Sequence, residues 1–203
     1  MHSSIADLAT LGRLFDEYRP RLLGMLERRI DMALRARIDP QDILQQAYLT
    51  AHVKWPTISA KYRQEKLVEQ SGFSIYAWLY REAWDELIEA YRKQSRAPRD
   101  MGRDMPWPEG SALQLGMSLM DNGTSPSGQM KREELCANVN SAMRLLKKEY
   151  REILWMRHFD QLSYQEISVV KEITENNAMV RHVRALKKFK ALWEQLQPFE
   201  RSA

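Results

Sequence analysis

One segment near the end of the chain combines residue types that can bind both the bases and the phosphates of DNA. Thr174 can cap the start of a helix. The first turn of that helix then presents Glu175, Asn176 and Asn177, whose amides and carboxylate can pair with base edges in a major groove. The following turns add cations suited to guanine edges or phosphates: Arg181, Arg184, Lys187 and Lys188. The segment therefore predicts a surface for duplex DNA.

A shorter helix is expected just before this one, so that the two form a helix-turn-helix. Ser163, with Glu166 three residues later, is a capping box that predicts a helix over residues 164–170. The turn carries Glu172 where such motifs often place a glycine, and a glutamate held at positive φ would cost on the order of 1 kcal/mol. The same pattern also fits a helical hairpin that only closes a bundle, with its charges as a solvated face.

A second candidate binding surface lies on a helix that begins near residue 40. Asp39 can cap this helix, Pro40 suits its first position, and the carboxylate of Asp42 can meet the free backbone donors of the first turn. Residues 39–50 carry acids and amides but no lysine or arginine. The helix therefore offers an acidic and polar face.

This helix is expected to end near Lys54, because Trp55-Pro56 disfavours its continuation. The polar stretch up to Gly72 should be irregular or only partly helical. From Phe73 to Ser95, apolar and aromatic residues recur every three or four positions, which predicts one long amphipathic helix. Trp84 belongs to the apolar stripe and is expected in the core.

The order of these elements predicts an all-α fold with two helical domains. Residues 5–37 have helical spacing, and Pro20 should start a new helix or bend one. Between residues 97 and 130 the pattern collapses into prolines, glycines and serines, which predicts a flexible linker joining a domain at 1–96 to a domain at 131–203. In the second domain, helices are expected over residues 131–146, 149–159, 164–170 and 174–196.

Composition permits nucleic-acid binding and disfavours other classes. The net charge is +4, and positive charge gathers at residues 92–103 and 181–190. No apolar run approaches the about 20 residues of a membrane span, and the first residues lack the pattern of an export signal, so a cytoplasmic protein is expected. The single cysteine, Cys136, is expected to be packed.

Enzymatic chemistry finds no support in the residue pattern. The four histidines are not spaced with acids or the cysteine as metal ligands would be, and no glycine-rich phosphate loop occurs. Neither a catalytic residue nor a metal or other cofactor is therefore expected. His182, which lies within the basic helix, is expected to neighbour a DNA phosphate.

Four segments, in the same order along the chain, resemble the extracytoplasmic-function group of sigma factors, the small members of the sigma-seventy family. Residues 39–48 look like the family's polymerase-binding helix, and residues 73–81 are similar to its promoter-melting helix. Ser125-Pro-Ser is typical of the join before the second domain. Residues 146–159, with the helix-turn-helix after them, complete that domain.

The chain departs from the family's usual residues at a few positions. Gln46 replaces an acid and Tyr48 replaces a phenylalanine in the first matching helix. Asp85 stands where the family usually has asparagine, and Glu89 where it usually has aspartate. A carboxylate at position 85 would repel the phosphates of a nearby DNA strand.

The resemblance implies two contacts for the first domain. Asp42, Gln45 and Gln46 would face the clamp helices of the polymerase's largest subunit, from a helix that also carries Asp39 and Tyr48. Residues 55–72, with the start of the next helix, would hold a flipped base of the minus-ten element, which needs an aromatic or apolar pocket and nearby cations. Candidate residues on that next helix are Trp78, Arg81, Asp85, Arg92 and Lys93.

The predicted function is that of a sigma factor, which joins core RNA polymerase and directs transcription from specific promoters without catalysing a reaction. The linker would run toward the polymerase active centre, and the helix-turn-helix would bind the minus-thirty-five element. A monomer is expected, and an anti-sigma protein is left open as a further partner. Two alternatives remain: a helix-turn-helix regulator that binds a duplex operator, and a sigma-like decoy that sequesters an anti-sigma protein.

Overall fold

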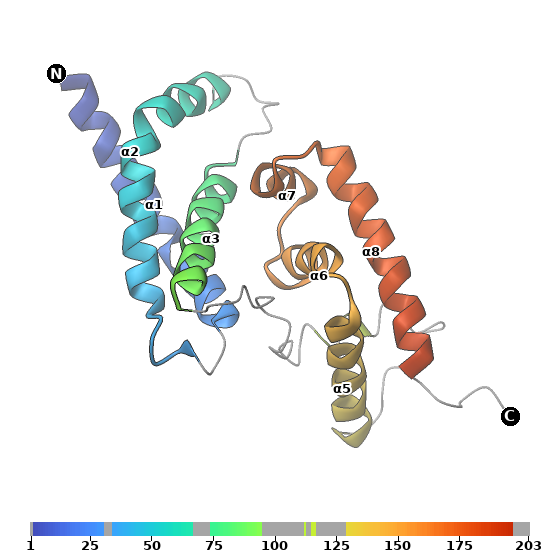
Figure 1. Cartoon of the computed structure of the whole chain (residues 1–203). Helices are drawn as coiled ribbons and strands as arrows, with labels where there is room; N and C mark the ends of the chain where they lie inside the picture. Colours follow the sequence, from blue (N-terminus) through green and yellow to red (C-terminus); the bar gives the residue numbers. More distant parts are fainter. Residues whose placement is uncertain are drawn as a thin grey trace, which may run out of the picture. The chain divides into compact units, whose positions relative to one another are not determined.

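Figure 1 shows the fold as a computed structural model, which describes residues 2–30, 34–66, 74–94, 112, 115–116 and 129–196. Within these ranges the chain forms helices and turns and contains no β-strand, so the predicted all-α class is confirmed. No helix in this part of the chain is long and apolar enough to cross a membrane.

Backbone contacts divide the chain into two compact units. The first consists of Met1–Gly102 and Gln165–Thr174, and the second of Arg103–Tyr164 and Glu175–Ala203. The domain limits expected from the sequence, 1–96 and 131–203, stay predictions.

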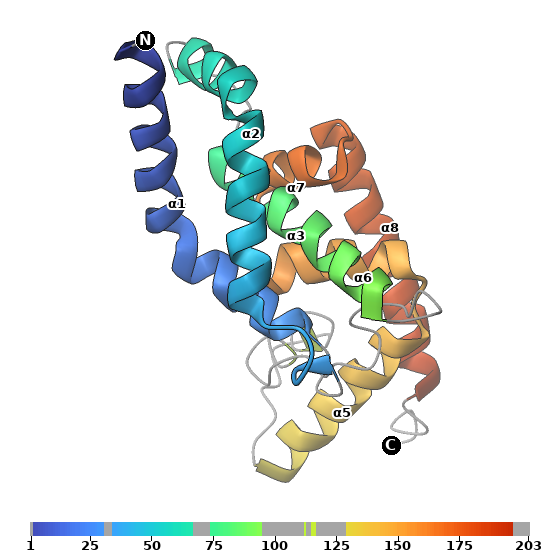
Figure 2. The same ribbon diagram turned by 60° about the vertical axis from the view of Figure 1, so that its left-hand side comes forward.

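The first unit contains three long helices, α1 (His2–Arg29), α2 (Pro40–Lys66) and α3 (Ile75–Gln94). Each of the three contacts the other two, and Figure 2 shows α1 and α3 on either side of α2. Each helix turns an apolar stripe inward, which removes that surface from water. Side chains buried at the centre include Leu11, Leu22, Met25, Leu44, Trp55, Tyr80 and Leu87.

Caps fix where α2 and α3 begin. The backbone N–H of Gln41 donates to Asp39 Oδ1 over 2.8 Å, and Pro40 is the first helical residue, as predicted. At α3 the backbone N–H of Ala77 donates to Ser74 Oγ over 3.2 Å. Local sequence therefore sets both starts.

Prolines lie inside two of these helices instead of ending them. Pro20 is internal to α1, which Figure 2 shows bending along its course. The prediction that α2 ends just before Trp55 is wrong, because α2 continues past Pro56 to Lys66 and changes direction on the way, as Figure 1 shows. A proline removes one helical hydrogen bond and bends the axis. Trp55 is buried beside Trp78, with 6.1 Å between ring centroids, and this packing supports the helix through the bend.

A buried arginine ties the end of α1 to α3. Arg29 is 5% exposed, and its Nη2 donates to the hydroxyl of Tyr80 over 2.8 Å. Its guanidinium also lies 4.5 Å from the centre of the Trp84 ring, and the Tyr91 hydroxyl donates to its backbone oxygen. Trp84 is buried, so its predicted place in the core is confirmed.

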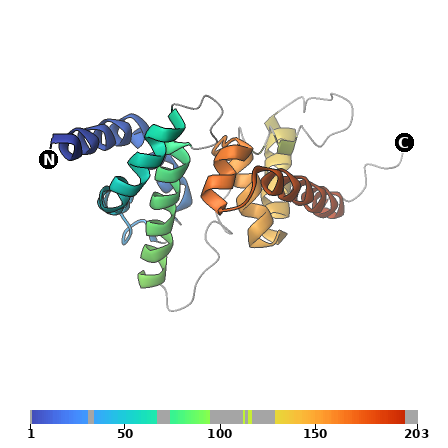
Figure 3. The same cartoon turned by 90° about the horizontal axis from the view of Figure 1, so that it is seen from above.

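The second unit is built from α5 (Gln129–Leu145), α6 (Lys148–Leu154), a single π-helical turn η2 (Trp155–Phe159) and α8 (Glu175–Leu196). Both α5 and α6 contact α8, which is drawn in dark red in Figure 3. The core of this unit includes Leu135, Val139, Leu154, Ala185, Phe189 and Trp193.

Part of the predicted linker belongs to this core. Of residues 97–128, the structure describes only Ala112, Leu115 and Gly116, and both Ala112 and Leu115 are fully buried. A Cβ atom placed on Gly116 would lie 3.0 Å from Leu135 Cδ1 and 3.1 Å from Trp193 Cη2, so a glycine permits this close approach. These positions are packed where the sequence predicted a flexible connection.

The expected helix, turn and helix occur in order near the end of the chain. The helix α7 (Tyr164–Lys171) is followed by a short turn and then by α8. The N–H of Ile173 donates to the carbonyl of Ser168, which closes the end of α7. Glu172 has a φ of 51°, so the strain that the sequence suggested at this position is present.

This turn yields a stability prediction. Glu172→Gly should be about 1 kcal/mol more stable than Glu172→Ala, because glycine adopts positive φ without the steric penalty of a Cβ atom. Both variants lack the carboxylate, so their difference isolates the backbone. Urea denaturation followed by circular dichroism measures it, and equal midpoints would show that the turn carries no strain in solution.

Candidate nucleic-acid and polymerase interfaces

The polar residues that the sequence singled out on the last helix lie on its exposed side. The buried side of α8 is formed by Ala178, His182, Ala185, Phe189 and Trp193. All eight candidate DNA-binding residues are exposed: Thr174, Glu175, Asn176, Asn177, Arg181, Arg184, Lys187 and Lys188. This surface, the α8 face, combines amides and a carboxylate at the helix start with four cations further along, which suits base edges and phosphates respectively.

His182 does not belong to the α8 face, so the expectation that it neighbours a phosphate is wrong. It is 6% exposed, and its Nε2 lies 2.9 Å from Nε2 of His158. Its other ring nitrogen, Nδ1, lies 3.0 Å from the Tyr164 hydroxyl. Arg157 lies over the Tyr164 ring, 4.8 Å from its centre. His182 therefore joins α8 to the η2 turn.

This cluster favours neutral histidines. Of two ring nitrogens 2.9 Å apart, one must donate and the other accept, so two protonated rings could not form the bond. Burial, together with the nearby His158 and Arg157, lowers the pKa of His182 to about 4. Burial and Arg157 also lower the pKa of His158.

The candidate polymerase-binding residues on α2 have three different environments. Asp42, Gln45 and Gln46 are exposed and available to a partner. Asp39 is exposed too, but its carboxylate already caps the helix. Tyr48 is half-buried and packs edge-on against Phe15 of α1, with 4.9 Å between ring centroids.

Two apolar residues that the sequence reading missed extend this surface. Leu49 is 51% exposed and Val53 is 79% exposed. Gln45, Leu49 and Val53 follow one another at intervals of four residues, so they lie along one side of α2. Exposed apolar side chains on a helix often mark a binding surface. The spacing from Gln45 could have revealed this row, here called the α2 face.

The candidate minus-ten residues on α3 are not gathered in one place. Trp78 is buried against Trp55, whereas Arg92 and Lys93 are exposed in the last turn of the helix. Arg81 and Arg92 are eleven positions apart, which corresponds to about 16 Å along a helix axis. Asp85, near Arg81, has much of its surface exposed. The part of it that is buried raises the pKa of its carboxyl.

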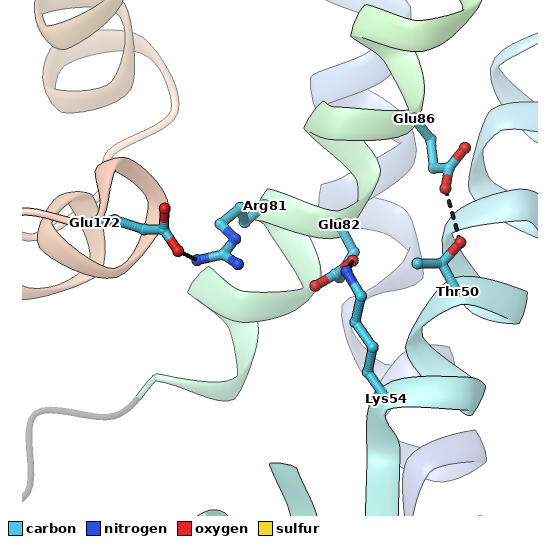
Figure 4. Close-up of polar contacts among 6 residues, drawn as sticks. All are labelled: Thr50, Lys54, Arg81, Glu82, Glu86 and Glu172. Atoms are coloured by element: carbon cyan, nitrogen blue, oxygen red, sulfur yellow. Dashed lines mark hydrogen bonds and ion pairs between the residues drawn. The ribbon is translucent and has the colours of Figure 1, made fainter. Parts of the chain in front are cut away.

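Figure 4 shows three polar contacts that α3 makes in the first unit. Arg81 Nη1 lies 2.6 Å from Glu172 Oε1, and the hydroxyl of Thr50 donates to Glu86 over 2.7 Å. Lys54 Nζ lies 2.7 Å from Glu82 Oε2. Glu82 is only 1% exposed, and nothing in its sequence context announced a buried carboxylate. Pairing with an ammonium offsets part of the cost of burying that charge.

Comparison with known proteins places this chain. Residues 137–189 match the family described as sigma-70, region 4. Over 195 residues, the chain is 27% identical to the RNA polymerase sigma-H factor of Pseudomonas aeruginosa, and the alignment covers 94% of this chain and 90% of that protein. Both matches make the chain similar to sigma-70 family factors. The region 4 match runs from α5 to Phe189 of α8, so it includes α7, the turn and all eight residues of the α8 face.

The histidine cluster predicts an acid-sensitive second unit. The folded-state pKa of His182, about 4, lies below its ordinary value of 6.5, so the unfolded chain takes up a proton first as the pH falls. Stability is therefore retained above about pH 6.5 and decreases between about pH 6.5 and 4. His182→Gln should flatten this dependence in thermal melts recorded across that range. His52→Gln, at an exposed histidine of α2, is the control, and equal slopes for the two variants would contradict the prediction.

Proposed function

We propose that this sigma factor belongs to the extracytoplasmic-function group and binds core RNA polymerase through the α2 face while its α8 face binds the minus-thirty-five element. As its similarity to sigma-70 family factors supports, it directs promoter-specific initiation of transcription. The observation that carries the proposal is the region 4 match over the segment that contains the exposed row of α8. The role is one of binding, and the polymerase supplies the catalysis.

The division of labour within the α8 face follows from its chemistry. Amide and carboxylate groups at the start of α8 are suited to base edges in a major groove. An amide can both donate to and accept from a base, and a carboxylate accepts from a base amino group, so both can distinguish one base pair from another. The cations from Arg181 to Lys188 are suited to phosphates or guanine edges. Burial of the opposite side of α8 supports this arrangement, since it holds the cations outward.

The α2 face suits a protein partner better than DNA. It consists of Gln45 with the apolar Leu49 and Val53, and the exposed Asp42 and Gln46 adjoin it in the sequence of α2. An exposed apolar pair gains free energy when a partner covers it, and the adjoining amides can form specific hydrogen bonds. In this proposal the polymerase clamp helices cover the row.

The proposal also assigns residues of α3 to the minus-ten element. Arg81, Arg92 and Lys93 would contact the minus-ten strand, with Trp78 forming an apolar wall and Asp85 lying beside them. A monomeric state is part of the same proposal, which leaves an anti-sigma partner open. Run-off transcription with core polymerase over a promoter library tests it directly. Promoter-specific transcript is the expected result, whereas a decoy or an operator-binding regulator would yield none.

Arg184→Ala should weaken promoter binding by about 1–3 kcal/mol, because it removes one base or phosphate contact. Arg144→Ala is the matched control, since Arg144 is an exposed arginine on another helix, α5. Holoenzyme binding to labelled promoter at fixed salt measures both. If the two variants bind equally well, Arg184 is not in the interface.

Gln45→Ala should impair assembly with core polymerase, and Val53→Asp should impair it more, because a charge would have to be buried in an apolar contact. Gln94→Ala, at an exposed amide in the last turn of α3, is the control. Co-purification with core polymerase measures assembly, and circular dichroism checks that each variant is folded. Normal retention of folded Gln45→Ala and Val53→Asp proteins would exclude the α2 face.

A further inference from the structure

Two carboxylates from the Gln165–Thr174 segment bind α3 in the first unit. Glu172 Oε1 lies 2.6 Å from Arg81 Nη1, and the two side chains point toward one another in Figure 4. At the start of α3, the hydroxyl of Ser74 donates to Glu166 Oε1 over 3.3 Å. Both acids belong to the same compact unit as α3. Their side chains therefore hold the segment to α3.

Glu172 occupies a backbone position that favours glycine. Its φ is 51°, which strains any residue that carries a Cβ atom. Its side chain is 72% exposed, so it is not needed to fill a core, and its carboxylate reaches out of the turn to Arg81. Strained residues persist where the rest of the structure makes use of them. The ion pair gives this side chain a use that the turn itself does not require.

The ion pair also joins groups that are proposed to bind two different promoter elements. Arg81 is a candidate for the minus-ten strand, and Thr174, a candidate for the minus-thirty-five element, is two residues from Glu172. Two residues of chain span at most about 7 Å, so the pair keeps both groups close together. The two elements are centred about 25 base pairs apart, on the order of 80 Å along a duplex. The paired arrangement therefore cannot contact both elements at once.

We propose that the ion pair between Arg81 and Glu172 is an autoinhibitory contact of the free factor, which must open before one molecule can bind both promoter elements. While the pair is closed, the Glu172 carboxylate takes the place of a DNA phosphate on the Arg81 guanidinium. Asp85, one turn further along α3, also lies near Arg81 but stays on the same helix when the pair opens. This inference rests on the proposed function, from which it takes the roles of Arg81 and Thr174.

The contact is weak enough for the polymerase to open it. The side chain of Arg81 is 28% exposed and that of Glu172 is 72% exposed. Ion pairs with this much exposure favour the closed state by about fivefold at most. Stable protein interfaces bury far more surface than one ion pair does, so assembly of the holoenzyme can supply the difference.

Carbodiimide cross-linking of the full chain tests the contact directly, because this reagent joins a lysine amine to a carboxylate without a spacer. In Arg81→Lys protein, mass spectrometry should detect an amide between positions 81 and 172 in the free factor. The same cross-link should be lost in holoenzyme bound to promoter DNA. Lys148 and Glu152, one turn apart on α6, are the internal control and should be joined in both states.

A second arm keeps Arg81 and measures binding. Fluorescence anisotropy follows the free full chain as it binds a labelled minus-ten single strand, taken from a promoter that the holoenzyme transcribes. Glu172→Gln should bind about two- to fivefold more tightly than the wild type, because Arg81 is released. Glu149→Gln removes the same charge from an exposed position of α6 and should bind like the wild type. Circular dichroism checks that both variants are folded.

The outcomes separate the two claims. If wild-type holoenzyme yields no promoter-specific transcript, the proposed function fails and the inference fails with it. If transcript appears, but the cross-link is absent from the free factor or persists in the promoter complex, the inference alone is overturned. Equal binding by Glu172→Gln and Glu149→Gln also overturns it. The ion pair would then only fasten the turn to α3.

Discussion

Burial of one side of each long helix is the constraint from which both candidate binding surfaces follow. In α8, buried residues recur every three or four positions, so packing against α5 and α6 fixes the rotation of the helix about its axis. Its cations then have only the solvent side left to occupy. The same holds for α2, where burial of Leu44 and Trp55 leaves Gln45 and Val53 on the outside. The surfaces for partners are thus the complement of the cores.

Buried polar groups fix how the helices pack, because hydrogen bonds depend on direction whereas apolar contacts do not. Arg29 holds the end of α1 against α3 through Tyr80 and Trp84, and His182 holds α8 against the η2 turn through His158. Each such group loses water on burial and must recover hydrogen bonds from the protein. Removing one partner would therefore cost more than the loss of a surface contact, and each group fixes which residues of two helices meet.

Much of the fold was predictable because its signals are local. The start of α2 is encoded in Asp39 and Pro40, and the amphipathic pattern of α3 places Trp84 in the core. The strained turn at Glu172 follows from a glycine position occupied by another residue. Pro56 led to the wrong prediction for the end of α2. A proline weakens a helix locally, but here the helix continues because Trp55, the residue before the proline, is buried in the core. The burial of Leu115 was missed because no local pattern indicates it: its neighbour Gly116 lies against Leu135 and Trp193, which come later in the chain.

By itself, the sequence determined the helical class, the helix starts, and which side of α8 carries charge, since capping and periodicity depend on neighbours within a few residues. Only the tertiary structure decided that His182 faces His158, that Trp78 packs on Trp55, and that Glu82 is buried beside Lys54. These outcomes depend on which residue of another helix lies opposite. That register is set by packing whole helices together, a long-range effect that no local pattern of residues contains.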